Sequence, residues 1–77
     1  MMEKAYNITR IEFESDFIIM IINNQTIRLK LSEISEKLAK ASAEQRNNFK
    51  VSPSGYGIHW PMLDEDLSVN GLLKAGR

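Results

Sequence analysis

The sequence predicts an α+β fold: an antiparallel three-strand meander, a helical arm, two further strands and a short terminal helical turn. Three observations predict this class. Apolar and polar residues alternate over residues 8–14 and 26–31, apolar residues then recur every three or four positions, and alternation returns between residues 49 and 60. The chain has 77 residues and no cysteine, so we expect a single domain, 1–77, held together by packing alone.

The first predicted strand spans Ile8 to Glu14. Ile11 and Phe13 fall on one face of it, and charged residues fall on the other. Ser15 and Asp16 then offer a tight connection to a second strand, residues 17–22. This run is apolar at every position, too short for a helix and rich in isoleucine, which predicts a strand covered on both faces.

The third predicted strand follows Asn23-Asn24-Gln25, where asparagine tolerates the left-handed backbone of a hairpin turn. After this turn Ile27, Leu29 and Leu31 alternate with polar residues. Three strands at these spacings form an antiparallel meander.

The helical arm is predicted to begin with Ser32 as its cap, and its apolar face is Ile34, Leu38 and Ala41. Residues 42–45 have the sequence of a capping box, which predicts a second helix start. Two helix starts so close together predict a broken arm instead of one straight helix.

The second half of the chain contains two further predicted strands. Phe49 and Val51 lie on one face of a strand that Pro53 stops. After a turn at Ser54-Gly55, residues 56–60 form the next strand, which ends at Pro61.

Residues 63–73 are predicted as a loop followed by one helical turn. Seven apolar residues are expected in the core: Phe13, Ile19, Ile21, Leu29, Leu38, Trp60 and Leu72.

The charge balance disfavours two classes of partner. Ten basic residues match ten acidic ones, so the chain lacks the net positive charge of most binders of nucleic acids or anionic membranes. The longest apolar run, residues 17–22, is too short to span a membrane, and residues 1–10 lack the order of a signal peptide. We therefore expect a soluble cytoplasmic protein with no membrane partner, for which nucleic acid is an improbable ligand.

One group of residues has the chemistry of a metal or acid–base site: His59 with Asp64, Glu65 and Asp66. The simpler interpretation is that the acidic residues precede a short helix and stabilise its positive end. A single histidine leaves too few ligands or partners for a catalytic set. We accordingly assign no catalytic, cofactor-binding or metal-binding residue, expect no cofactor, and predict that the protein is not an enzyme.

Trp60-Pro61, preceded by Tyr56, offers two interpretations. An aromatic residue at a strand end can form a recognition surface. Trp60 is also the largest side chain available to a small core, and it shares a strand face with Ile58. The shared face favours the core.

Four basic residues could form a phosphate-binding stripe: Arg28, Lys30, Arg46 and Lys50. Acidic residues are interleaved with them along the chain, which favours a solvated face of mixed charge.

Residues 41–48 and 55–73 together resemble a known family. The second stretch contains Ile58-His59-Trp60-Pro61 and continues through Asp64-Glu65-Asp66 to Leu73. It is similar to the pattern I-x-W-P-x-L-D-E-D-[LI]-S-V-x-G-L-L that ends the short bacterial proteins of domain-of-unknown-function family 2442. The hairpin turn at Asn23-Asn24-Gln25 departs from the relatives, which tend to have an Asp-Gly turn there.

The resemblance implies an α+β fold with no agreed activity. Some relatives carry an appended helix-turn-helix. Family members are often encoded beside another small protein, which implies one half of a two-gene pair of toxin–antitoxin type.

We therefore predict a non-enzymatic interaction module that binds a protein partner, such as the neighbouring gene product, or a second copy of itself. A homodimer is expected because one helical arm covers only one face of the apolar strand 17–22. The alternatives are a nucleic-acid-associated regulator and a metal-dependent enzyme that uses His59 with Asp64 and Asp66.

Overall fold

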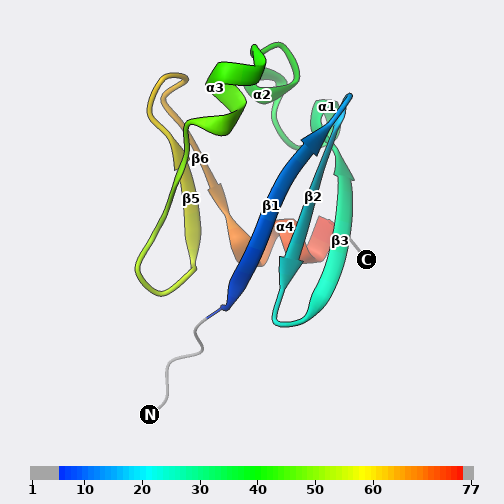
Figure 1. The fold of residues 1–77 in the computed structure, drawn as a ribbon, viewed down its shortest axis with the longest axis vertical. Coiled ribbons are helices and arrows are strands. Elements are labelled where there is room, and N and C mark those ends of the chain that lie inside the picture. Colours follow the sequence, from blue (N-terminus) through cyan, green and yellow to red (C-terminus); the bar gives the residue numbers. More distant parts are fainter. Residues whose placement is uncertain (1–5, 76–77) are drawn as a thin grey trace.

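Two three-stranded antiparallel sheets lie on either side of an apolar core in the computed structural model, which describes residues 6–75 (Figure 1). Three short helices cover one end of this sandwich, and a fourth helix bridges the sheets nearer the other end. The predicted α+β class is confirmed. None of the helices in the described part of the chain is long and apolar enough to cross a membrane.

The first sheet is the predicted meander, with strands β1 (Ile8–Glu14), β2 (Phe17–Ile22) and β3 (Gln25–Lys30) in the order β1-β2-β3. Its turns contain residues with left-handed backbones: Ser15 has φ 54°, and Asn23 and Asn24 have φ 52° and 68°. Two consecutive residues with positive φ form the hairpin turn that matches the twist of paired strands, and asparagine tolerates this conformation. The expected asparagine turn is confirmed.

Strand β2 is fully buried on one face only. Ile18, Met20 and Ile22 are buried against the core, whereas Phe17, Ile19 and Ile21 point to the opposite face and are half-buried. The prediction that Ile19 and Ile21 belong to the core is therefore wrong, and β2 is not fully covered on both faces. A strand that is apolar at every position gives no alternation from which its inward face could be deduced.

The helical arm consists of α1 (Leu31–Ile34), α2 (Glu36–Ala39) and α3 (Ala43–Asn47). Ser35, and not Ser32 as predicted, caps α2: its hydroxyl accepts a hydrogen bond from the Leu38 amide at 3.2 Å. The capping box at Ser42 is confirmed, since Ser42 and Gln45 bond each other's backbone amides. The arm is broken at Ser35 and again before α3.

The second sheet contains β4 (Lys50–Val51), β5 (Gly57–Trp60) and β6 (Glu65–Ser68), followed by helix α4 (Val69–Ala75). Strand β6 corrects the prediction of a loop there. It pairs antiparallel with β5, so that Asp66 lies opposite His59 and Leu67 lies opposite Ile58. Helix α4 contacts both β6 and β3 and thereby joins the two sheets.

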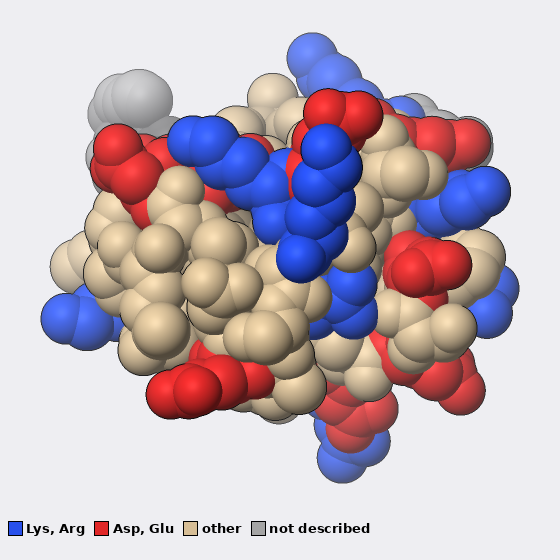
Figure 2. Space-filling view, turned by 90° about the horizontal axis from the view of Figure 1, so that it is seen from above, with Lys and Arg blue, Asp and Glu red and all other residues tan. Residues whose placement is uncertain are grey.

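The core draws on both sheets, the helical arm and α4, and its buried apolar members are Ile18, Met20, Ile22, Ile27, Leu29, Leu31, Leu38, Ile58, Trp60, Val69 and Leu72. Of the expected core, Leu29, Leu38, Trp60 and Leu72 are confirmed, while Phe13 faces inward but is only half-buried. Seen from the helical end, one short run of basic side chains lies near the centre with acidic ones on either side, and further basic side chains lie singly around the edge (Figure 2).

Candidate interaction surface

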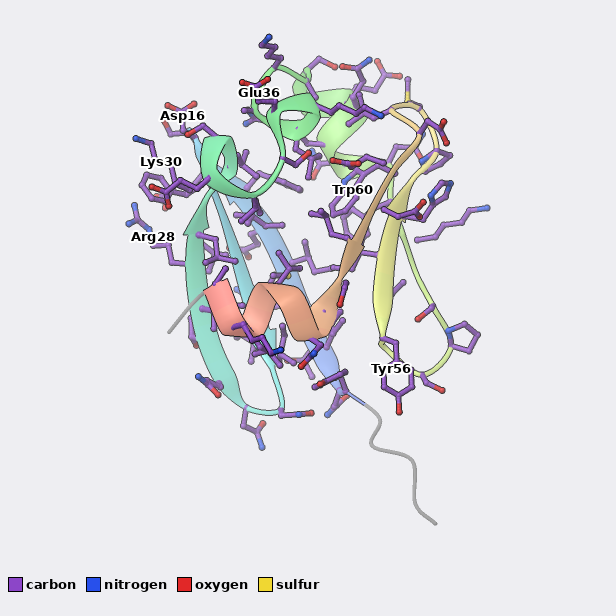
Figure 3. The ribbon with its side chains drawn as sticks, turned by 180° about the vertical axis from the view of Figure 1, so that it is seen from behind. Asp16, Arg28, Lys30, Glu36, Tyr56 and Trp60 are labelled. Atoms are coloured by element: carbon purple, nitrogen blue, oxygen red, sulfur yellow. The ribbon has the colours of Figure 1, made fainter. Side chains whose placement is uncertain are left out.

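The outer face of the first sheet carries a strip of apolar side chains from β2. Phe17, Ile19 and Ile21 lie on it, each half-buried. No helix or strand of residues 6–75 lies over this face, and Arg28 and Lys30 point from it into solvent (Figure 3). The strip is covered only by the side chains beside it.

Both acidic residues of this outer face lie on β1, which also carries Arg10, and the basic residues Arg28 and Lys30 lie on β3. The register places Phe17 between Glu14 of β1 and Lys30 of β3. Directly opposite residues in antiparallel strands share a face, so their side chains form a row across the sheet. The three rows are Glu14–Phe17–Lys30, Glu12–Ile19–Arg28 and Arg10–Ile21–Thr26. We call these nine residues the outer face.

Two contacts within the outer face engage its charged side chains, one with Phe17 of the apolar strip and one between two residues of β1. The Arg28 guanidinium carbon lies 3.8 Å from the centre of the Phe17 ring, within the range of a cation–π interaction. Arg10 Nη1 donates to Glu12 Oε2 at 2.9 Å, and both side chains are more than half exposed. An exposed ion pair of this kind contributes about 0–1 kcal/mol, so another partner can readily replace it.

The predicted acid–base group is split by the structure. The Nδ1–H of His59 donates to Asp66 Oδ1 at 2.6 Å on the outside of the second sheet, with the side chains 43% and 76% exposed. Glu65 points inward and accepts a hydrogen bond from the Ser35 hydroxyl. Asp64 lies in the turn before β6 with φ 52°, and its carbonyl accepts from Lys37 Nζ at 3.2 Å.

His59 and Asp66 border an open depression of about 310 Å³ on the second sheet. Neither Asp64 nor Glu65 lines it; the lining residues are Lys50, Val51, Ser52, Gly57, Ile58, His59, Asp66 and Leu67. Within residues 6–75 no three histidine, cysteine or acidic residues are grouped as metal ligands would be. The depression offers one imidazole and one carboxylate, both well solvated.

Trp60 belongs to the core. Its side chain is fully buried, its indole Nε1 donates to the carbonyl of Arg46 at 2.9 Å, and its ring packs against Phe49 with centroids 6.1 Å apart. The preference for the core over a recognition surface is confirmed. Tyr56 is 39% exposed and meets the Tyr6 ring edge to face.

Arg46 has a structural role that the sequence did not reveal. Its guanidinium donates to the carbonyls of Leu38 and Ala39, both at 3.0 Å, and to that of Ser15 at 2.8 Å. A basic side chain that bonds the last carbonyls of a helix stabilises its end. Arg46 thereby ties α2 to the β1–β2 turn. With Lys50 on the second sheet, the four basic residues do not form one stripe.

The sequence analysis did not predict the outer face as one surface, although it identified the charged positions on the strands that form it. Glu12 and Glu14 occupy the polar positions of the first predicted strand, and Arg28 and Lys30 occupy those of the third. The sequence did not show which face of β2 points to the core. That information is needed to see that these four charged residues share one surface with Phe17, Ile19 and Ile21.

Residues 8–77 match a family described as protein of unknown function (DUF2442). The fold is similar to a crystal structure of a protein of unknown function from Rhodospirillum rubrum, with 27% identity and a TM-score of 0.70 over 92% of this chain and 88% of that one. It is also similar to the solution structure of an uncharacterised protein from Chromobacterium violaceum, with 27% identity, a TM-score of 0.68, and coverage of 91% of this chain and 66% of that one. The sequence matches no curated protein.

Proposed function

This chain belongs to the DUF2442 family of proteins of unknown function, and from that premise we propose that it is a non-enzymatic interaction module that binds a second copy of itself through the outer face of the first sheet. The observation that carries the proposal is the outer face itself: an apolar strip on β2, flanked by acidic residues on β1 and basic residues on β3.

The apolar strip supports a protein partner because its burial is favourable. Each square ångström of apolar surface removed from water contributes roughly 25 cal/mol. Phe17, Ile19 and Ile21 retain part of their surface in the isolated chain, and the flanking side chains shield them incompletely. A small domain gains proportionally more from additional burial than a large one.

The charge pattern supports a second copy as the partner. In two of the three rows an acidic residue on β1 stands across from a basic residue on β3, and such a pattern is complementary to itself after a half-turn; the third row pairs Arg10 with the neutral Thr26. The chain carries no net charge, so two copies do not repel each other overall. A partner of strongly acidic or strongly basic character would match only one of the two edges.

Two alternative functions receive less support. A metal-dependent enzyme would need Asp64 to converge with His59 and Asp66, and only Asp66 meets the imidazole. A nucleic-acid regulator would need a continuous basic face, whereas Arg46 is engaged with backbone carbonyls, and Arg28 and Lys30 of the outer face each have an acidic residue in their row.

We also propose a cytoplasmic location, because small secreted domains usually rely on disulfides and this chain contains no cysteine. A neighbouring gene product of the kind implied by the resemblance would compete for the outer face. Co-expression of that protein with this chain would then yield a complex of the two proteins in place of the homodimer. Such a result would favour a heteromeric pair over the proposed homodimer.

The proposal is tested by sedimentation equilibrium on the wild-type chain and two variants. Ile19→Lys places a charge at the centre of the apolar strip, and Val51→Lys makes the same kind of change at an exposed apolar position of the second sheet. We expect dimers for the wild type and Val51→Lys, and a monomer for Ile19→Lys with an unchanged circular dichroism spectrum. A wild-type chain that stays at 8.8 kDa up to ~1 mM, a concentration at which even weak pairs associate, would overturn the proposal.

If Ile19→Lys fails to fold, Ile21→Lys takes its place at the next outward position of β2. A folded variant at either position that dimerises as strongly as the wild type would remove the outer face from the contact.

A further inference from the structure

We infer that the two copies pair with their two-fold axis running along β2, so that β1 of one copy lies over β3 of the other. This inference rests on the proposed function and adds the orientation of the dimer, which the proposed function leaves open. It follows from the order of charges across the outer face.

A symmetric contact between two identical sheet faces has its two-fold axis in the plane between them. Two orientations keep the strands of both sheets aligned, as packed sheets prefer. With an axis along β2, the partner's strands run across the contact in the reverse order, so that its β1 lies over β3. Each row of residues then faces the same row of the partner. An axis across the strands keeps the strand order and reverses the order of the rows.

The axis along β2 brings opposite charges together. Glu14 then lies over the partner's Lys30, and Glu12 lies over the partner's Arg28. By symmetry each of these contacts occurs twice. In the middle of the contact Phe17, Ile19 and Ile21 each meet their own copy, which produces an apolar centre between two charged borders. This arrangement, with an apolar core and a polar rim, is typical of protein interfaces.

The axis across the strands brings like charges together in the central row. Glu12 would lie over the partner's Glu12, and Arg28 over the partner's Arg28. Glu14 would meet the partner's Arg10, so this orientation also forms two contacts between opposite charges, but it places Lys30 over the partner's Thr26 and leaves both charged positions of the central row opposite like charges. Directly opposed like charges are destabilising, so the first orientation is favoured.

Cross-linking distinguishes the two orientations, because the native chain has no cysteine and a single introduced thiol is unique. Packed sheets lie about 10 Å apart, so a short bismaleimide can link side chains that face each other. Phe17→Cys, Ile19→Cys and Ile21→Cys are prepared separately. With the axis along β2, all three variants cross-link to their own copies.

With the axis across the strands, only Ile19→Cys would cross-link to itself, and a mixture of Phe17→Cys and Ile21→Cys would cross-link to each other. That pattern would overturn the inferred orientation while leaving the proposed homodimer intact. A wild-type chain that is monomeric in sedimentation would instead overturn the proposed function. Val51→Cys on the second sheet is the control and should yield no cross-linked dimer.

A charge exchange gives a second test that needs no cross-linker. The variant E12K/E14K/R28E/K30E interchanges the acidic and basic edges. With the axis along β2 it forms its own homodimer, and an equimolar mixture with the wild type sorts into homodimers, so that native mass spectrometry finds heterodimer at well below half of all dimers. Heterodimer at half or more would contradict the inferred orientation.

Discussion

Trp60 links three parts of the molecule through one side chain. Its ring fills the centre of the core, while its Nε1–H satisfies a carbonyl of α3 and its backbone belongs to β5. A residue with both functions contributes to stability in two separable ways, the packing of its ring and its hydrogen bond.

We expect Trp60→Ala to lower the free energy of unfolding by ~3–5 kcal/mol, because it leaves a large cavity in the core. Trp60→Phe keeps a ring but removes the hydrogen bond to Arg46, so its loss should be smaller than that of alanine. Urea denaturation followed by circular dichroism measures both. An unchanged midpoint for the alanine variant would contradict the assignment of Trp60 to the core.

Gly55 lies where no other residue fits. Its φ is +72°, and a Cβ built on it would lie 2.1 Å from the carbonyl oxygen of Tyr6. Gly55→Ala should therefore lower the melting temperature, since the left-handed backbone alone costs a residue with a Cβ ~1–2 kcal/mol. Gly71→Ala is the matched control: the nearest atoms to its Cβ are 3.8 Å away, and alanine favours helix α4. Equal melting temperatures for the two variants would refute this explanation.

The residues around His59 show which part of the candidate site could not be predicted from the sequence. The turn after Trp60 returns the chain alongside β5 and brings Asp66 to His59, although the sequence predicted a loop there. Asp64 and Glu65 were grouped with them only because they are adjacent in sequence. In a strand, successive side chains point to opposite faces, so Glu65 faces Ser35 while Asp66 faces His59.

Among the elements, the boundaries of β1 and the capping box of α3 were predictable from local chemistry alone. Strand β6 was not. It has four residues, and Leu67 is its only apolar side chain, so its alternation is too weak to recognise, and its acidic start resembles the beginning of a helix. Strand β6 is instead defined by its backbone pairing with β5, which its side-chain pattern does not indicate.

The break in the helical arm distinguishes two serines. Ser35→Ala removes the cap of α2 and the hydrogen bond to Glu65, so we expect a loss of ~1–2 kcal/mol of stability. Ser32→Ala, at the cap position that the sequence predicted, should change stability by less than ~0.5 kcal/mol because that residue is exposed. Thermal denaturation of both variants measures the two losses of stability. A larger loss for Ser32→Ala than for Ser35→Ala would contradict the assignment of Ser35 as the cap.

For the whole molecule, dimerisation and folding are coupled. Any partner that binds the folded chain and not the unfolded one raises the apparent stability as its concentration rises. We therefore expect the melting temperature of the wild type to increase by several degrees over a ~100-fold range of protein concentration. Ile19→Lys should show no such dependence. A wild-type melting temperature that is independent of concentration would argue against self-association.

Each sheet is built from strands that are consecutive in the sequence, β1-β2-β3 and β4-β5-β6. Closing the loop between neighbouring strands costs little chain entropy, and proteins whose contacts are close in sequence fold quickly. The strands of the first meander can pair before the second half of the chain has left the ribosome, because none of its ladder partners comes from that half, although its inner face is buried only when Ile58, Trp60, Val69 and Leu72 pack on it. A nascent chain would thus present its outer face early, which allows two chains made on neighbouring ribosomes of one message to meet during synthesis.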